Sequence, residues 1–218
     1  MKSASKPLTL IAILCFALSA SGSFTLLSSC TGEAARKMPA VNSPAIDEGN
    51  IYARLRGKAA SLKGYLRANN YNTNYCFLVD MYITSGRKRF FVYNLEKDMV
   101  EEAGLVAHGS GSDVKGEDLY FSNTPNSNCT SLGRYKIGKS YYGNWGLSYK
   151  LYGLDASNSN AFTRAVVLHA HEAVPDDEVD PYHICESWGC PMVSPSFFQD
   201  LRTYIDHSAK PILLWIYY

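Results

Sequence analysis

The sequence feature that constrains the fold most is a short apolar run, residues 164–168 (RAVVL), that ends directly at a histidine. Aliphatic and β-branched residues in a run of this length predict a buried β-strand. His169 and Ala170 are then expected at the edge of that strand. After a polar loop the chain reaches a turn, residues 187–191 (SWGCP), which holds a cysteine between a glycine and a proline. A strand-end histidine followed by a cysteine turn is the layout of a cysteine acyl-transfer site.

Cys190 is the candidate nucleophile of this layout. A cysteine attacks as a thiolate, and its ordinary pKa of about 8.5 leaves little thiolate at neutral pH without a partner, for which His169 is the leading candidate. Gly189 permits a backbone φ that other residues resist. The N–H groups of Trp188, Gly189 and Cys190 are expected to form an oxyanion pocket, and Pro191 to fix the exit from the turn. The alternative is that Cys190 is a small buried hydrophobe.

These residues resemble a known family. His169 followed by residues 187–190 (SWGC) resembles the signature of the L,D-transpeptidases (YkuD-type domains), which remodel bacterial peptidoglycan. Trp188 stands where many members carry a second histidine. Blocks upstream resemble the murein L,D-transpeptidase catalytic-domain branch, and they are residues 106–111 (VAHGSG), 121–123 (FSN), 131–133 (SLG), 142–143 (YG) and 151–154 (LYGL).

The resemblance implies both a fold and a reaction. The fold is α+β but predominantly β, a YkuD-like β-sandwich with a few flanking helices. Cys190 would attack a carbonyl of a peptidoglycan stem tetrapeptide, form a thioester and release D-Ala, while His169 takes the thiol proton. Transfer to an amine would cross-link the third residues of two stems, and transfer to water would make the enzyme an L,D-carboxypeptidase. No metal or organic cofactor is expected.

Four further positions are candidates for the site, each with a plainer alternative. His108 either lines the substrate cleft or ends a strand, and Asn123 either contacts substrate or belongs to a turn. Trp188 either forms an apolar wall for substrate or packs on the domain. Ser187 either holds the cysteine turn or bonds near the thiolate.

The choice of base has alternatives as well. His169 and His171 point to the same face of an extended strand, so both could lie near the thiol. His183 is a third histidine, more typical of a loop or surface position. The resemblance favours His169, and the carbonyl of Ala170 or a nearby polar group is expected to orient its ring.

The loop between the histidine and the cysteine is acidic, with Asp176, Asp177, Glu178 and Asp180. A solvated loop explains these residues. The sharper hypothesis is a flap that attracts a cationic part of the substrate, such as the free amine of diaminopimelate.

Two other classes of function remain open. Imidazole and thiolate are preferred zinc ligands, and the candidates for a zinc site are His169, His171, His183, Cys185 and Cys190. The sequence has no other part of a metal-hydrolase motif. A non-catalytic envelope lipoprotein that binds peptidoglycan is the second class, and the intact pair of His169 and Cys190 argues against it.

The N-terminus predicts export. Lys2 and Lys6 precede an apolar run, residues 8–18 (LTLIAILCFAL), which is too short for a comfortable membrane span. This is the pattern of a secretory signal. Ordinary signal-peptidase cleavage near residues 19–23 is one way in which it would be processed.

Residues 27–30 (LSSC) resemble a bacterial lipobox, which predicts a second way of processing, cleavage before Cys30. Residues 1–29 would then be a lipoprotein signal peptide and Cys30 the lipid-modified residue. Residues 30–45 are expected to be a tether, and residues 46–218 a catalytic domain. The predicted location is the bacterial envelope, as a periplasmic or outer-membrane-anchored lipoprotein.

Length and charge limit the remaining possibilities. The chain leaves room for one catalytic domain and not comfortably for two. Removing residues 1–29 takes away two lysines and no acidic residue, which changes the formal net charge from +1 to −1. No basic patch indicates a nucleic-acid partner. Peptidoglycan stem peptides are the expected partners, and a monomer is the expected state.

The chain has six cysteines, of which Cys15 and Cys30 belong to the leader and the lipobox. The others are Cys76, Cys129, Cys185 and Cys190. Once Cys190 is reserved as nucleophile, three remain, an odd number. A bridge between Cys129 and Cys185 is possible in an oxidising periplasm, whereas one between Cys185 and Cys190 would block catalysis. No bridge is assigned.

Local patterns predict the remaining elements. Apolar residues at steps of three and four predict an amphipathic helix, with Tyr52, Leu55, Ala59, Leu62 and Leu66 on its inner face. Residues 76–81 and 89–94 are aromatic and β-branched and predict two strands, followed by a third at residues 105–108. Ser194 and Pro195 predict the start of a helix, and residues 212–218 a last buried strand.

Overall fold

The computed structural model describes residues 48–113 and 118–218. The predicted signal peptide, the lipidation site Cys30 and the tether lie outside the described residues. Within the described part, no helix is both long enough and apolar enough to cross a membrane.

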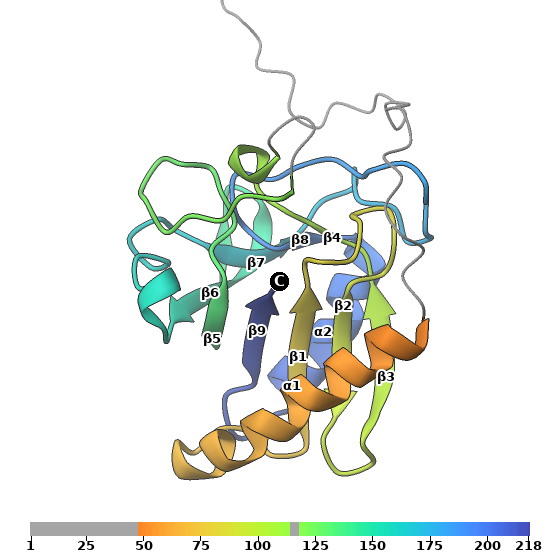
Figure 1. The fold of residues 1–218 in the computed structure, drawn as a ribbon. Helices are drawn as coiled ribbons and strands as arrows, with labels where there is room; N and C mark the ends of the chain where they lie inside the picture. Colours follow the sequence, from red (N-terminus) through yellow and green to blue (C-terminus); the bar gives the residue numbers. More distant parts are fainter. Residues whose placement is uncertain (1–47, 114–117) are drawn as a thin grey trace, which may run out of the picture.

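Nine strands form one hydrogen-bonded sheet in the order β3-β2-β1-β9-β5-β6-β7-β8-β4 (Figure 1). The pairs β1–β9 and β7–β8 are parallel, and the other pairs are antiparallel. The strands are β1 (Tyr75–Asp80), β2 (Phe90–Asn94), β3 (Met99–Gly104), β4 (Val106–Ala107), β5 (Gly133–Gly143), β6 (Gly146–Gly153), β7 (Val167–Ala170), β8 (Met192–Val193) and β9 (Leu213–Tyr217). The predominantly β fold class with few helices is confirmed.

The helix α1 (Glu48–Ala68) is the predicted amphipathic helix. Its buried positions are Ile51, Leu55, Ala59, Leu62 and Leu66. Tyr52 was wrongly predicted as an inner position, because its side chain is 57% exposed. Ile51 takes that place, since it lies four residues before Leu55 and therefore on the same helix face.

The two long helices cover opposite faces of the sheet (Figure 1). Successive residues of a strand point to opposite faces. In β1, Cys76 and Leu78 accordingly pack in the cluster under α1, while Phe77 and Val79 pack in the larger cluster under α2 (Pro195–Asp206). Strands β1, β2 and β9 are therefore buried on both sides.

The helix α2 begins as the sequence predicts. The Ser194 hydroxyl accepts a hydrogen bond from the backbone N–H of Phe197 at 3.3 Å, and Pro195 is the first helical residue. This side-chain cap satisfies one of the donors that a helix N-terminus leaves unpaired. Because α2 starts directly after β8, it braces the segment that carries Cys190.

The sequence prediction missed one strand and did not place another within the sheet. β3 was missed, because its sequence MVEEAG carries two glutamates and lacks an apolar alternation. It lies at the end of the strand order, where one edge has no neighbouring strand. The predicted last strand is present as β9, and it occupies the middle of the sheet, parallel to β1 and antiparallel to β5.

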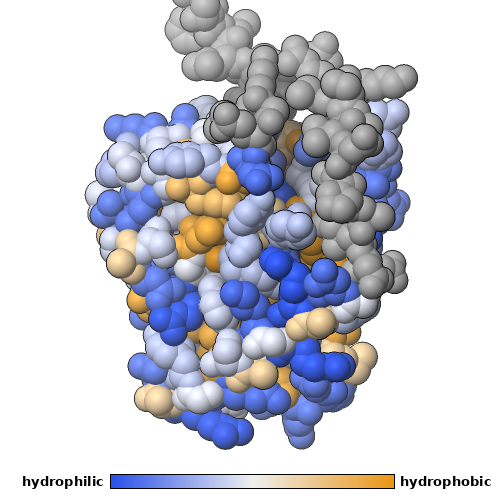
Figure 2. Space-filling model, in the orientation of Figure 1, coloured by the Kyte–Doolittle hydropathy of each residue, from blue (hydrophilic) through white to orange (hydrophobic). Residues whose placement is uncertain are grey.

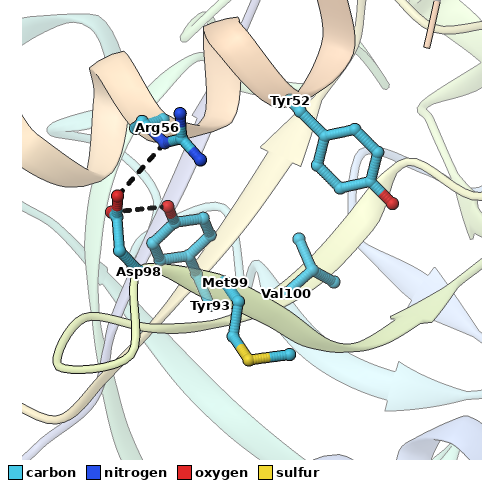
Figure 3. A pocket seen from close by; sticks show the side chains of 6 residues that line it. All are labelled: Tyr52, Arg56, Tyr93, Asp98, Met99 and Val100. Carbon is cyan, nitrogen blue, oxygen red and sulfur yellow. Dashed lines mark hydrogen bonds and ion pairs between the residues drawn. The ribbon is translucent and has the colours of Figure 1, made fainter. Parts of the chain in front are cut away.

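The outer side of α1 belongs to a largely hydrophilic face of the molecule (Figure 2). A cavity of about 230 Å³ lies between α1 and β3 (Figure 3). Its lining consists of Tyr52, Arg56, Tyr93, Asp98, Met99 and Val100. Asp98 accepts a hydrogen bond from the Tyr93 hydroxyl at 2.8 Å and pairs with Arg56 at 3.1 Å. None of the predicted site residues lines this cavity.

Candidate active site

Strand pairing brings the predicted histidine and the cysteine turn to neighbouring positions. β7 runs parallel to β8 with His169 opposite Met192, two residues after Cys190. The Cys190 Sγ accepts a hydrogen bond from the backbone N–H of Val167 at 3.4 Å. Val167 and His169 are two residues apart in one strand, so their side chains point to the same face. The turn that carries Cys190 is thus fixed against the strand that carries His169.

The His169 ring is held in one tautomer. Its side chain is buried, and its Nδ1 lies 3.1 Å from the carbonyl oxygen of Ala170. A carbonyl can only accept, so Nδ1 carries the proton and Nε2 presents a lone pair. Burial lowers the pKa of His169 below its ordinary value, and the neighbouring His171 lowers this pKa further. The hydrogen bond to the Ala170 carbonyl raises the pKa in part. The sequence named Ala170 as one candidate for orienting this ring, and the geometry fits that role.

The thiol of Cys190 is also held in its neutral form. Burial raises the pKa of Cys190, while the Val167 N–H and the positive charge of Arg164 partly oppose this. Besides its bond from Val167, the Sγ lies 3.9 Å from the carbonyl oxygen of Ala165. Within the described residues no hydrogen bond joins the thiol to the His169 ring. The resting pair is therefore a neutral thiol beside a neutral imidazole.

Gly189 and Ser187 shape the cysteine turn. Gly189 has φ +103°, and a Cβ there would lie 2.6 Å from the carbonyl oxygen of Cys129. The Ser187 hydroxyl donates to the Cys190 carbonyl at 2.6 Å and accepts from the Gly189 N–H at 3.1 Å. Of the two roles predicted for Ser187, its bonds fit the one of holding the turn.

These bonds also narrow the predicted oxyanion pocket. The Gly189 N–H already donates to the Ser187 hydroxyl, so it is not free to bind a developing oxyanion. The N–H groups of Trp188 and Cys190 remain as candidates, because neither donates to another acceptor in the described part of the chain. Trp188 is 58% exposed, which suits the predicted wall for substrate.

Sequence reasoning missed Arg164 as a site residue. Its guanidinium donates to the Cys129 carbonyl at 2.6 Å and to the Ser122 carbonyl at 2.9 Å. It also lies close to Gly189, where an added Cβ would be 3.1 Å from one of its nitrogens. Arg164 thus ties its own loop to the loop that carries Ser122 and Cys129. It also places a positive charge near Cys190. The sequence pattern that could have identified Arg164 is its position directly before an apolar strand.

Sequence reasoning also missed Trp145. This residue lies at the tip of the β5–β6 hairpin and is 48% exposed. Its ring stacks on His169 with centroids 5.7 Å apart and an interplanar angle of 24°. It meets the rings of His171 and Trp188 edge-on, at 5.8 Å and 6.2 Å. A tryptophan between Gly143 and Gly146 in a hairpin was the signal that could have found it.

An open cleft of about 350 Å³ adjoins this aromatic group. Its lining consists of Trp145, Ala170, His171, Glu172 and Pro195. Both Trp145 and Ala170 contact the His169 ring. The cleft therefore shares a wall with the candidate base.

His108 lies behind the nucleophile turn and does not line an open cleft, because its side chain is 4% exposed. Its carbonyl accepts from the Ser187 N–H at 2.8 Å, and its Nδ1 accepts from the buried guanidinium of Arg89 at 2.8 Å. Burial and the charge of Arg89 lower the pKa of His108 to about 3. The predicted substrate-binding role does not fit this position.

The zinc alternative would need His169, His171, His183, Cys185 and Cys190 to converge. Among the described residues, the group that does converge is different: His108, Asp113 and Glu186, with ligand atoms within 4.8 Å of one another. Because Arg89 can only donate, Nδ1 of His108 is the acceptor and its neutral ring carries the proton on Nε2. This tautomer leaves no lone pair on Nε2 for a metal.

Asn123 holds two loops together. Its side-chain amide donates to the Ala156 carbonyl at 3.2 Å and to the Ser159 hydroxyl at 3.1 Å, and its side-chain oxygen accepts from the Asn160 N–H at 3.1 Å. Both ends of the amide are therefore used within the protein. This arrangement matches the plainer of its two predicted roles, that of a turn residue.

Most of the acidic loop is tied to the rest of the domain. Asp176 accepts a hydrogen bond from the Ser196 hydroxyl, and Glu178 accepts one from the Lys88 N–H at 2.8 Å. Asp180 accepts one from the Thr84 hydroxyl at 3.3 Å. These bonds fit a loop fastened to its neighbours.

No disulfide joins the cysteines of the described part. Cys76, Cys129 and Cys190 are free thiols. The Cys129 thiol donates to the Gly111 carbonyl at 3.1 Å. The bridge considered between Cys129 and Cys185 is therefore not formed, and Cys190 is left available as a nucleophile.

Solved structures with a similar fold share little sequence with this chain. An L,D-transpeptidase from Xylanimonas cellulosilytica is 12% identical, with 71% of this chain and 68% of that one covered and a TM-score of 0.36. The helical cell shape determining protein Pgp2 from Campylobacter jejuni is 11% identical, with 65% and 46% covered and a TM-score of 0.40. The Ldtfm–avibactam carbamoyl enzyme is 11% identical, with 66% and 49% covered and a TM-score of 0.41. The chain spans about half the length of these last two proteins.

The sequence comparison is more specific. Among curated protein sequences, none matches this chain. The sequence profile of the L,D-transpeptidase catalytic domain matches residues 52–217, which include the strand of His169 and the turn of Cys190. The chain therefore belongs to the L,D-transpeptidase catalytic domain family.

Proposed function

We propose that this protein is a cysteine-dependent L,D-transpeptidase that acts on the stem peptides of peptidoglycan. The observation that carries the proposal is the local geometry of His169 and Cys190. The His169 ring presents its Nε2 lone pair because Nδ1 donates to Ala170, and the Cys190 turn is bonded to the same strand through Val167. A base of fixed tautomer beside a thiol is what nucleophilic acyl transfer needs.

The first half of the reaction is acylation. The sulfur of Cys190 attacks the carbonyl carbon that precedes the terminal D-Ala, and the thiol proton passes to Nε2 of His169. The N–H groups of Trp188 and Cys190 bind the oxyanion. The C–N bond to D-Ala then breaks, the leaving amine takes the proton from His169, and a thioester remains on Cys190.

The second half is transfer of the acyl group. An amine of a second stem attacks the thioester and loses its proton to His169, the C–S bond breaks, and the thiolate recovers a proton from His169. Water in place of the amine gives the L,D-carboxypeptidase reaction. Which acceptor reacts depends on how the cleft beside His169 holds an amine.

The test is intact-protein mass spectrometry of the purified protein mixed with tetrapeptide muropeptides. An adduct equal in mass to the stem without D-Ala is expected on the native protein and absent from Cys190→Ala. The matched control is Cys185→Ala, which removes a neighbouring half-buried thiol and should keep the adduct. Well-folded native protein that forms no adduct and releases no D-Ala would refute the proposal.

We further propose that the protein is held at a membrane of the bacterial envelope by a lipid on Cys30. The support is the lipobox-like sequence of residues 27–30 after an apolar leader. In the producing bacterium, a clickable fatty-acid probe should label the native protein and Cys15→Ala, but not Cys30→Ala. Absence of label from the native protein, or label that persists in Cys30→Ala, would contradict lipidation.

A further inference from the structure

One face of the β5–β6 hairpin carries a connected row of aromatic rings and lysines. The row consists of Lys136, Tyr152, Phe162, Lys150 and Tyr141, and Phe162 joins it from the loop before β7. The Tyr152 and Phe162 rings stack with centroids 5.3 Å apart and an interplanar angle of 12°. The Lys136 Nζ lies 5.2 Å from the centre of the Tyr152 ring. The Lys150 Nζ lies 5.6 Å from the centre of the Phe162 ring and 5.2 Å from that of Tyr141.

Strand alternation places this row on the surface. Successive residues of a strand point to opposite faces. Tyr135 and Tyr149 pack in the core cluster under α2. Lys136 and Lys150, the next residues of the same strands, point away from that core and are exposed. Phe162 is 56% exposed. Apolar groups that gather on a surface mark an interaction site, whereas single exposed ones need no explanation.

Two glycines let rings of the row lie against the sheet. A Cβ at Gly138 would be 2.5 Å from Cε2 of Tyr152, and a Cβ at Gly143 would be 2.8 Å from Cε2 of Tyr141. A side chain at either position would push the ring off the strand. The two rings therefore lie over the backbone of the hairpin, and Phe162 stacks on one of them as the most exposed ring of the row.

The charges of the row define the ligand that it suits. The row contains no acidic residue, and within the described residues neither Lys136 nor Lys150 forms an ion pair. The face of an aromatic ring is partly negative and attracts C–H groups, which are partly positive. Lysines attract carboxylates. A chain of sugar rings that bears carboxylates has both features, because each sugar presents a face of C–H groups.

The row leads along the hairpin toward the candidate active site. Trp145 at the tip of the hairpin stacks on His169. Tyr141 is paired with Ser148, which lies three residues from Trp145, on the order of 10 Å along a strand. A stem peptide of four residues spans at most about 14 Å when extended. A glycan strand on the row is thus close enough to present one of its stems to the site.

We propose that this row is a docking surface for the glycan strand of peptidoglycan, separate from the catalytic residues. Sugar rings stack on Phe162 and Tyr141, and carboxylates of the polymer face Lys136 and Lys150. The inference rests on the proposed function for the identity of the polymer. It adds recognition of the sugar chain to a reaction that takes place on the peptide.

The experiment measures binding without turnover, by cosedimentation of the Cys190→Ala protein with purified peptidoglycan sacculi. In this background Phe162→Ala should raise the Kd roughly two- to tenfold, the usual effect of one aromatic contact. Phe162→Trp should keep the parental Kd. Lys150→Gln should raise the Kd and make it less dependent on salt. Tyr52→Ala is the matched control, because Tyr52 is 57% exposed on α1 and outside the row, and it should leave the Kd unchanged.

Competition identifies the part of the polymer that is bound. Glycan strands freed of their stems by an amidase keep a carboxylate on every muramic acid, and they should displace the protein from the sacculi. Free stem tetrapeptides should leave most of it bound. The proposal is overturned if the parent does not bind sacculi, if Phe162→Ala keeps the parental Kd, or if the stripped strands fail to displace the protein. A native protein that binds through the row but gives no burst of D-Ala refutes the proposed function instead, so the two failures are distinguishable.

Discussion

At the residue scale, burial sets the ionisation of both candidate catalytic side chains, Cys190 and His169. It raises the pKa of Cys190 and lowers that of His169, so the resting site holds no preformed thiolate–imidazolium pair. The proton must then leave the thiol while the sulfur attacks. His169 serves as a general base in this scheme, which requires its Nε2 to be unprotonated.

The first prediction concerns the pH dependence of acylation. A base with a lowered pKa stays unprotonated to more acidic pH, so the acid limb of the rate should have its midpoint below pH 6.5, the ordinary value for histidine. The rate falls along this limb as His169 gains its proton. The measurement is the burst of D-Ala as a function of pH. An acid limb with its midpoint at or above 6.5 would contradict the assigned effect of burial.

The second prediction concerns Trp145, which we regard as a positioning residue for His169. Trp145→Ala should lower the acylation rate by roughly two- to tenfold, the usual worth of an aromatic pair. It should also move the acid limb of the pH profile upward, because the uncovered ring is better solvated when charged. Trp145→Phe should retain most of the native behaviour.

Tyr142→Ala is the control for Trp145, since Tyr142 belongs to the same hairpin and is 84% exposed. It should leave both the rate and the pH profile near the native values. If Trp145→Ala changes the rate without moving the acid limb, Trp145 does not act through the burial of His169.

The third prediction concerns Gly189. Its φ of +103° is rarely adopted by residues with a side chain, and an added Cβ would press on the Cys129 carbonyl. Gly189→Ala should cost on the order of 1–3 kcal/mol of unfolding free energy and greatly reduce thioester formation.

Gly57→Ala is the contrasting variant, because Gly57 lies within α1 with open space around it. It should stabilise the protein by roughly 0.5–1 kcal/mol in urea unfolding.

At the scale of elements, α1 contributes mainly through one apolar stripe. Leu55 and Leu66 are fully buried and Leu62 nearly so, whereas Tyr52 and Arg56 face the cavity beside β3. The ion pair of Arg56 with Asp98 joins two largely exposed side chains, so it contributes little to stability. The stripe, not the ion pair, attaches the helix to the sheet.

The fourth prediction follows from this difference. Leu62→Ala should lower the free energy of unfolding by about 2–5 kcal/mol, because it removes a buried side chain and leaves a cavity. Tyr52→Ala on the outer part of the same helix should cost less than about 1 kcal/mol. Urea unfolding of both variants measures the contrast, and equal losses would show that α1 is not attached through its stripe.

At the scale of the whole molecule, the site is assembled from segments far apart in the chain. Trp145 comes from a hairpin, His169 from β7 and Cys190 from the turn before β8. Behind that turn, the buried guanidinium of Arg89 joins several parts of the fold. It donates to the Val106 carbonyl at 2.9 and 3.0 Å, to the Ile83 carbonyl at 3.0 Å and to His108.

The fifth prediction tests this buried guanidinium. Arg89→Gln leaves the Val106 and Ile83 carbonyls short of donors in the interior, so it should lower the free energy of unfolding by about 3–5 kcal/mol. Arg87→Gln changes the same residue type at a half-exposed position nearby and should have little effect. Comparable unfolding midpoints for the two variants would contradict the structural role of Arg89.

The strand of His169, the cysteine turn, the capped helix α2 and most of the stripe of α1 were predictable from the sequence. Each is specified by residues within a few positions of one another. The spacing of apolar residues specifies which face of a helix or strand is buried. A proline after a serine specifies a helix start, and a glycine beside a cysteine specifies a tight turn. Tyr52 is the exception in the helix. Either Ile51 or Tyr52 could take the buried position in the first turn of α1, and only packing against the sheet decides between them.

The sequence by itself determined the chemistry of the candidate site, a cysteine turn and a strand-end histidine, together with the predominantly β character of the domain. Tertiary structure alone decided that Trp145 covers His169, that Arg164 lies under the turn, that His108 is buried behind it and that β9 enters the middle of the sheet. The physical reason is the range of the contacts. Trp145 and His169 meet through strand pairing across 24 residues of chain, and no local period or spacing encodes such a contact.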